Sequence, residues 1–366
     1  MEKRVAGGAG VVEGLRMKPR AMQMYSRGME GRWWHVVSRV VDRRFVFGQE
    51  EREKFSELMR RVERFSGVEV VTWTILSNHF HIVLHVPEMP VGGISEEEFW
   101  ERLTALYGRE GVADILWEME EMRKVNPGAT GELLVQAYRE RFIRRMHDLS
   151  QFMKTLLQRF TMWFNGRHER VGRLWESRFK SLLIEGEWSC VMAVAAYVDL
   201  NALRAGLVED PKDYRWCGYA EAVAGKAVAR RGLKGLYESR TSPEEGEPPR
   251  IPVTWRKVSQ TYRQLLYGIG SQSKVSAEGK DLRRVIPGAE VAAVMAKEGA
   301  LSLPELLRHR VRYFTDGAVL GSRGYVDEMF QAKRGFFGEK RQSGARRMRG
   351  GEWQDLYCLR DLQIPK

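Results

Sequence analysis

The sequence predicts an α+β protein built on an antiparallel sheet. Between residues 33 and 86, the hydrophobic pattern indicates a strand, a helix and then two strands joined by a two-residue polar connection. Two-residue connections are typical of antiparallel hairpins. The 366 residues exceed one compact domain of roughly 150 residues, and 43% of them are hydrophobic, so we expect a real core with additional helical segments.

The first strand is expected over residues 33–41, where aromatic and β-branched side chains predominate and both faces are apolar. A helix over residues 49–65 follows, because Phe55, Leu58 and Val62 recur at helical spacing, and Gly67 ends it. The hairpin strands are then expected over residues 68–76 and 79–86.

The later pattern is mostly helical. Residues 96–121 carry nine acidic against two basic side chains and are expected to form an acidic helical cap that closes at Asn126-Pro127-Gly128. Residues 133–164 are expected to form one long helix and residues 187–207 another. Linker composition follows at residues 241–249 and 268–279, and short helices are expected after Ser302 and over residues 325–330.

These segments divide the chain into four expected parts. A core domain comprises residues 20–86 and 150–223, interrupted by the acidic helical insertion at residues 87–149. Residues 224–280 are expected to be a linker. Residues 281–366 are expected to be a basic helical C-terminal domain, since residues 333–349 carry seven basic side chains against one acid.

The charge balance limits the function classes. The 60 Lys and Arg residues against 48 Asp and Glu residues give a net charge of +12, which indicates a polyanionic partner, with nucleic acid first. No stretch approaches the roughly 18 apolar residues of a membrane span, so we expect a cytoplasmic, nucleoid-associated protein without a membrane partner. Three widely spaced cysteines predict neither a disulfide framework nor a thiolate zinc site.

Basic and aromatic side chains alternate in residues 151–181, which contain seven Lys or Arg against two Glu. This mixture suits a groove that follows the backbone of single-stranded DNA and stacks its bases. The candidate phosphate contacts are Arg159, Arg173, Arg178 and Lys180. A core helix with a solvated charged face would have the same composition, and composition does not separate the two interpretations.

Two histidines begin the second hairpin strand. Alternation along a strand places His79 and His81 on one face, about 7 Å apart at the backbone, and Phe80 on the other, apolar face. The pair could bind one divalent ion, or it could be two ordinary residues on a wet face. Val83 and Leu84 stand where a His-x-His-x-Asp-His zinc hydrolase has its Asp and last His, so that class is excluded. A further oxygen ligand would suit magnesium or manganese.

A tyrosine nucleophile can be sought by its spacing from such an oxygen ligand. Tyr197 and Asn201 lie one helical turn apart on a predicted helix, so one face would present a phenol and an amide together. A buried tyrosine hydrogen-bonded to asparagine would give the same sequence pattern.

Three motifs in order resemble the single-tyrosine HUH transposases, and most of all the REP-associated tyrosine transposases. They are the histidine pair within Ser-Asn-His-Phe-His-Ile-Val-Leu at residues 77–84, the segment Arg-Leu-Trp-Glu-Ser-Arg-Phe-Lys-Ser at residues 173–181, and the segment from Tyr197 to Val208. The resemblance covers about residues 20–219. Residues 311–322 also look like a C-terminal segment of some longer relatives.

The resemblance implies a ferredoxin-like antiparallel sheet with helices on one face, the HUH transposase fold. It implies that His79, His81 and Asn201 bind Mg²⁺ or Mn²⁺. It further implies that Tyr197 is the nucleophile, which attacks a phosphate of single-stranded DNA to give a 5′-phosphotyrosine and a free 3′-hydroxyl.

The first hypothesis is therefore a metal-dependent endonuclease and strand transferase for DNA transposition, acting on single-stranded, hairpin-flanked DNA as a monomer or a homodimer. The second is a catalytically inactive, transposase-derived protein that binds DNA or RNA hairpins. A replication nickase is a third, disfavoured because no second tyrosine lies near Tyr197 on its helix face.

Overall fold

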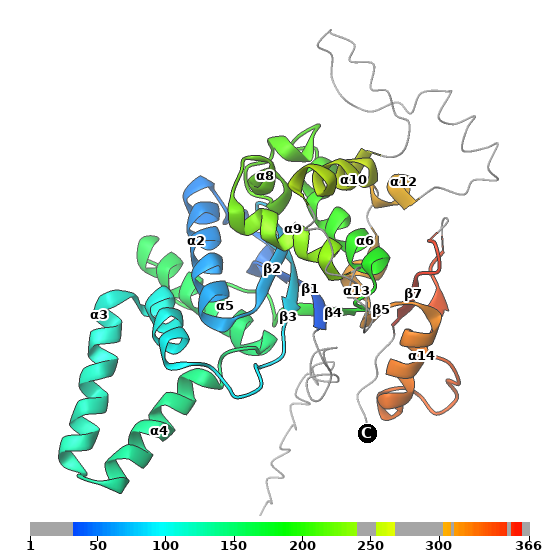
Figure 1. Ribbon diagram of the computed structural model, residues 1–366. Helices are drawn as coiled ribbons and strands as arrows, with labels where there is room; N and C mark the ends of the chain where they lie inside the picture. The colour runs from blue at the N-terminus through cyan, green and yellow to red at the C-terminus, as the bar shows by residue number, and fades with distance from the viewer. Residues whose placement is uncertain (1–31, 240–253, 268–302, 309–310, 350–352, 361–366) are drawn as a thin grey trace, which may run out of the picture.

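A computed structural model describes residues 32–239, 254–267, 303–308, 311–349 and 353–360 (Figure 1). Its centre is a seven-stranded sheet with the strand order β2-β3-β1-β4-β5-β7-β6. Neighbouring strands are antiparallel except β4 and β5, which are parallel. The mixed α+β class with a mostly antiparallel sheet is thus confirmed.

The first four strands form the ferredoxin-like unit that the resemblance implied. In chain order its elements are β1 (Arg32–Arg39), α2 (Gln49–Ser66), β2 (Glu69–Ile75), β3 (His79–Val86), α5 (Leu149–Arg167) and β4 (Lys180–Ile184). The β-α-β-β-α-β order and the strand order β2-β3-β1-β4 are those of a ferredoxin-like fold. The predicted helix ends as expected, because Gly67 adopts a left-handed conformation with φ of 69° at its C-cap.

One face of the sheet is covered by α2 and α5. Phe80 of β3 contacts Phe55 of α2, with ring centroids 4.6 Å apart, and Phe55 contacts Phe160 of α5 at 5.2 Å. All three rings are completely buried. This aromatic cluster lies on the face of β3 that carries Phe80, which the alternation along the strand predicted to be apolar.

The opposite face carries further helices. They are α6 (Trp188–Asp199), α7 (Asn201–Arg204), α8 (Gly218–Val223), α9 (Ala227–Ser239) and α10 (Trp255–Tyr267). Val83 of β3 is buried in the same apolar cluster as the α6 residues Val194 and Val198. The histidine face of β3 was considered as a wet surface, and this is wrong for His81, which is buried under α6.

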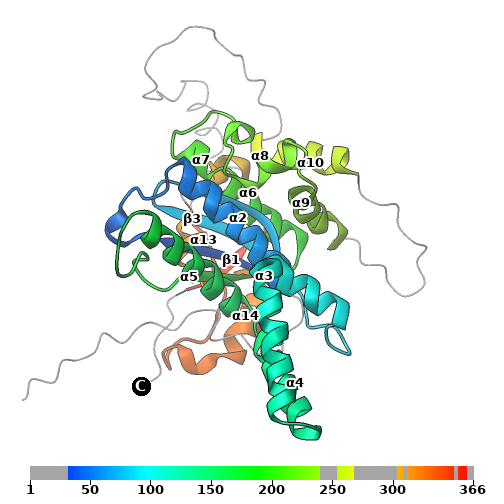
Figure 2. The same ribbon diagram turned by 90° about the vertical axis from the view of Figure 1, so that its left-hand side faces the viewer.

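The acidic insertion is helical, as predicted. It consists of α3 (Glu96–Val125), bent at Gly108 where φ is 76°, and α4 (Ala129–Ile143), and it projects from the body as an arm (Figure 2). The expectation of one helix over residues 133–164 is wrong. The chain breaks between α4 and α5, where His147 has a φ of 49° and Asp148 caps the new helix by accepting the Gln151 amide.

The expected linker at residues 224–280 is also wrong in part, since α9 and α10 lie within it and pack in the same apolar cluster as α6. The proline-rich stretch at residues 241–249 and the stretch at 268–279 lie outside the described residues. The amphipathic patterns of α9 and α10 stand next to segments of linker composition, and the sequence analysis did not distinguish the helices from those segments.

The C-terminal region is not a separate helical domain. Its strands β5 (Val319–Gly321), β6 (Arg346–Arg347) and β7 (Tyr357–Leu359) extend the central sheet from β4. Its helices are α12 (Leu303–Leu307), α13 (Arg312–Asp316) and α14 (Arg323–Ala332). Three 3₁₀ turns complete the described elements, at Val41–Arg43, Pro211–Asp213 and Arg334–Phe336. No helix in the described ranges is long and apolar enough to span a membrane.

Candidate active site

The structure brings the predicted histidine pair and tyrosine together. His79 and His81 lie on the same face of β3, with ring centroids 5.2 Å apart. The Tyr197 ring lies edge-on to His81, with centroids 6.1 Å apart. His81 and Tyr197 are 116 positions apart in the sequence. They share one site because α6 lies across the histidine face of the sheet.

Helix α6 can occupy this position because nearly all of its side chains are apolar. Every residue from Cys190 to Asp199 is buried, as expected for a helix enclosed by a sheet and other helices. The Thr74 hydroxyl of β2 donates to the carbonyl oxygen of Val198 at 2.7 Å and ties the end of the helix to the sheet. This bond holds the turn that carries Tyr197.

Tyr197 itself is covered. Only 2% of its surface is exposed. The Phe314 ring of α13 lies edge-on to it at 5.1 Å, and the Arg204 guanidinium carbon lies 3.9 Å from the centre of its ring. Burial lowers the pKa of Arg204 to about 10, against the raising effect of the Tyr197 side chain, so the group is cationic at neutral pH.

A third imidazole, His35 of β1, completes the cluster and was not predicted. His35 Nε2 lies 2.9 Å from His81 Nδ1, and the two rings are stacked at 5.1 Å. The signal was present, because alternation along β1 places His35 on the same face as Val37, which pairs with His81. The pairing of β1 with β3, however, could not be read from either strand alone.

The two buried imidazoles are neutral at neutral pH. Burial lowers the pKa of His35 to about 4, and its hydrogen bond to the Phe314 carbonyl opposes this shift only in part. Burial and the neighbouring His35 lower the pKa of His81 well below 6.5. Neutral imidazole is the form that can ligate a metal ion.

The third expected ligand, Asn201, starts a new helical turn after a break at Leu200. It is buried, and its amide nitrogen donates to the carbonyl oxygens of Tyr197 and Val198 at 3.4 and 3.3 Å. Among the described residues no three His, Cys, Asp or Glu side chains form a ligand group. Two imidazoles with an amide oxygen still fit a divalent ion in their chemistry, since the carbonyl oxygen suits magnesium and manganese and imidazole ligates divalent transition ions.

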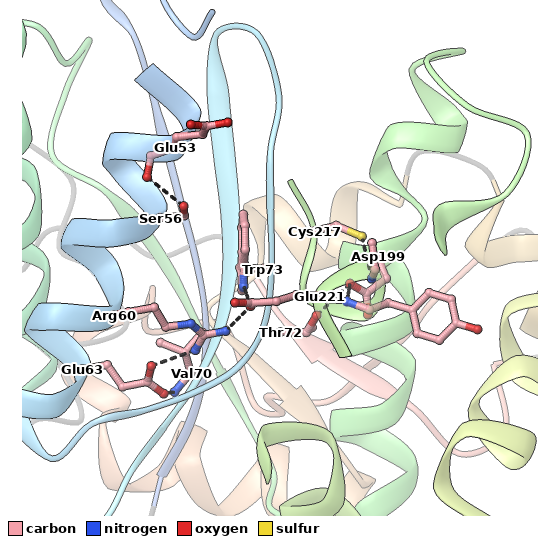
Figure 3. A network of polar contacts seen from close by, with 12 residues as sticks. Glu53, Ser56, Arg60, Glu63, Val70, Thr72, Trp73, Asp199, Cys217 and Glu221 are labelled. Carbon is pink, nitrogen blue, oxygen red and sulfur yellow. Dashed lines mark hydrogen bonds and ion pairs between the residues drawn. The ribbon is translucent and has the colours of Figure 1, made fainter. Parts of the chain in front are cut away.

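Between Tyr197 and Asn201 lies Asp199, whose side chain is fully buried. Its carboxylate accepts from the Thr72 hydroxyl at 2.7 Å and the Tyr262 hydroxyl at 2.5 Å, and from the backbone amide of Tyr219. Figure 3 shows Asp199 beside Thr72 and Cys217. These bonds connect α6 with β2, α8 and α10.

A second polar group in Figure 3 surrounds the edge strand β2. Glu221 of α8 accepts from Arg60 of α2 at 2.5 Å and from the Trp73 indole at 3.2 Å. Glu63 accepts from the same Arg60 and from the backbone amide of Val70. The helices on the two faces of the sheet are therefore connected around its edge, and an edge-strand amide is satisfied.

The four candidate phosphate contacts lie in different environments. Arg159 is half-buried with its guanidinium 5.2 Å from the Tyr107 ring of the insertion. Arg173 and Arg178 are exposed. Lys180 is exposed at the start of β4, pairs with Val37 on the same face as His81, and forms an ion pair with Asp316 at 3.0 Å. The structure thus brings Lys180, but not Arg159, toward the histidine face.

Three further histidines of the sequence are not part of this cluster as described. His147 hydrogen-bonds to the Pro87 carbonyl, His168 pairs with Glu51 at 2.9 Å, and His309 lies outside the described residues.

A family model agrees with the motifs found in the sequence. Residues 30–94 match the model of a family described as Transposase IS200 like. A solved structure of a REP-associated tyrosine transposase bound to a REP hairpin is 14% identical, with a TM-score of 0.34, and the match covers 62% of this chain and 95% of that chain. No curated protein matches significantly. The family match over residues 30–94 confirms the resemblance to the IS200-like transposases.

Proposed function

We propose that the protein is a divalent-metal-dependent endonuclease and strand transferase that acts on single-stranded, hairpin-flanked DNA through Tyr197. The observation that supports this most is the position of the Tyr197 ring, 6.1 Å from the His81 ring on the face that also carries His79. A phenol next to two imidazoles is the arrangement that a tyrosine nucleophile with a metal-bound phosphate requires.

His79, His81 and Asn201 would hold Mg²⁺ or Mn²⁺, which supplies Lewis-acid polarisation of the scissile phosphate when bound. Tyr197 Oη would attack the phosphorus as the bond to the 3′ oxygen breaks, so that the products are a 5′-phosphotyrosine and a 3′-hydroxyl. The phenol loses one proton in this step and the departing 3′ oxygen takes up one, so the step is balanced in protons. The Arg204 guanidinium carbon, 3.9 Å from the centre of the ring, favours the phenolate. Attack by another 3′-hydroxyl on the phosphotyrosine would reverse the step and join the strands.

The burial of Tyr197 adds a condition to this proposal. Phe314 and Arg204 cover the ring, and Arg204 is itself held by the carbonyl oxygens of Leu307 and Tyr197, each at 2.7 Å. A phosphate can reach the phenol only after this cover has moved. DNA binding would therefore have to displace the segment that contains α12 and α13.

The same burial favours a second candidate, a transposase-derived protein that binds DNA or RNA hairpins without cleaving them. Such a protein would keep the fold and basic surface while Tyr197 stays enclosed at 2% exposure. The two candidates differ in one product, the covalent protein–DNA adduct.

The adduct is the test. The protein would be incubated with hairpin oligonucleotides that carry single-stranded flanks and with Mg²⁺ or Mn²⁺, and denaturing gels would be read for a shifted, covalent band. We expect a band from the unmodified protein and none from Tyr197→Phe, with unchanged DNA affinity. Tyr219→Phe is the matched control, since its buried hydroxyl has no hydrogen-bond partner in the described structure. Absence of an adduct from the unmodified protein, over a panel of hairpins and both ions, would support the binding protein instead.

A further inference from the structure

Two hydrogen bonds run from the C-terminal segment to the candidate metal ligand. The Phe314 carbonyl oxygen lies 2.9 Å from His35 Nδ1, and His35 Nε2 lies 2.9 Å from His81 Nδ1. Both rings are almost fully buried, with 1% and 3% of their surfaces exposed. Water therefore does not compete for these bonds, and each is correspondingly hard to replace.

The direction of the first bond determines the second. A carbonyl oxygen only accepts, so His35 Nδ1 must carry a proton and donate it. A neutral ring has one N–H, which leaves His35 Nε2 as an acceptor. His81 Nδ1 must then be the donor between the two rings, and His81 Nε2 keeps its lone pair.

We infer that His35 is a positioning residue that holds His81 in the tautomer whose Nε2 can bind the metal ion. The inference rests on the proposed function, because it assigns His81 a ligand role. A donor bond from the second ring nitrogen of a ligating histidine to a fixed acceptor sets its tautomer and orientation. The acceptor in this protein is another histidine, and the stacking of the two rings at an angle of 15° keeps that acceptor aligned.

We call the two hydrogen bonds from the Phe314 carbonyl through His35 to His81 the histidine relay. The relay begins at the backbone of Phe314 in α13. Its carbonyl lies 279 positions from His35 in the chain, and it is the group that sets the proton on His35. The C-terminal region would thus belong to the metal site, although it lies outside the part that the transposase family model matches.

The test separates the hydrogen bonds of the residue at position 35 from the space that it fills. In His35→Gln, the amide can still donate to the Phe314 carbonyl and accept from His81, whereas His35→Leu can do neither. Mn²⁺ affinity of the full-length protein would be measured by electron paramagnetic resonance without DNA. We expect binding about 10- to 100-fold weaker in His35→Leu and nearly unchanged in His35→Gln. His85→Leu is the matched control, on the same strand as His81 but bonded to Glu69 at the surface.

A second measurement needs neither metal nor catalysis. Nitrogen NMR of the histidine-labelled, metal-free protein reports which ring nitrogen of His81 carries the proton. We expect Nδ1–H in the unmodified protein and in His35→Gln. A proton on Nε2 in the unmodified protein would overturn the inference even if His35→Leu did not fold, and so would equal Mn²⁺ affinity in a folded His35→Leu. If His81 carries its proton on Nδ1 but the protein binds no Mn²⁺, the hydrogen bonds through His35 would be confirmed and the proposed metal chemistry would be contradicted.

Discussion

Asp199 is a buried acid that lies between the proposed nucleophile and the proposed amide ligand. Burial raises its pKa to about 7, and the bonds from Tyr262, Thr72 and Tyr219 oppose that shift. The carboxyl group therefore titrates near neutral pH. Because the same group connects α6 to three other elements, its protonation bears on the stability of the turn that holds Tyr197.

The sign of the pH effect follows from the raised pKa. The folded protein binds the proton more tightly than the unfolded chain, so this contribution to stability is full below pH 4 and is lost as the pH rises through about 7. Between pH 6 and pH 8 its loss should lower the free energy of unfolding by on the order of 1 kcal/mol. Asp199→Asn mimics the protonated acid and should remove that share of the slope. Urea unfolding of both proteins at the two pH values measures this difference. An equal pH dependence of the free energy of unfolding in the two proteins would contradict the raised pKa of Asp199.

Helix α9 shows how closely elements pack on the edge of the sheet. A Cβ atom at Gly232 would lie 2.6 and 2.7 Å from the carbonyl oxygens of Val70 and Val71 in β2. The helix can approach the strand only because this residue has no side chain. This contact makes α9 part of the core, although its surroundings in sequence resemble a linker.

Gly232→Ala should therefore force α9 away from β2 and lower the free energy of unfolding by about 1 to 3 kcal/mol. Gly235→Ala is the matched control in the same helix, because a Cβ there would meet no atom within 4 Å. The control should be neutral or should stabilise the helix by up to about 1 kcal/mol. Chemical denaturation of the two variants gives the comparison, and equal effects would mean that α9 does not pack against the strand as described.

At the scale of the whole molecule, opposite charges lie on different parts. The arm formed by α3 and α4 is rich in acidic residues, whereas the net charge of the chain is +12. A DNA backbone should avoid the arm and approach the body, where Arg178 is exposed and Lys180 is exposed on the histidine face of the sheet. Arg159 packs against the Tyr107 ring and is not exposed in the same way.

The salt dependence of DNA binding tests this arrangement. Each phosphate contact to a single strand contributes about 0.7 to the slope of log affinity against log salt. Lys180→Ala and Arg178→Ala should each reduce the slope by about that amount. Lys124→Ala, on the acidic arm, and Arg159→Ala should leave it unchanged. Fluorescence anisotropy of a labelled oligonucleotide over a salt series gives the slopes. If Arg159→Ala also reduced the slope by about 0.7, Arg159 would be a phosphate contact after all.

Local pattern was enough to predict the elements that define the fold. The βαββ order, the hairpin and the face shared by His79 and His81 all depend on periodicities of two or 3.6 residues within short segments. Tyr197 was placed on a helix by the same reasoning. The break between α4 and α5 and the helix α9 were missed, because each depends on what the segment packs against.

Which side chains share a strand or helix face can be read from the amino-acid sequence, because that information lies within a few neighbouring residues. Only the tertiary structure decided that His35 pairs with His81, 46 positions away, and that Phe314, 279 positions from His35, ends the relay. It also decided that the C-terminal strands join the central sheet and that α13 covers Tyr197. These contacts form between segments with no common periodicity, so they depend on how the whole chain packs.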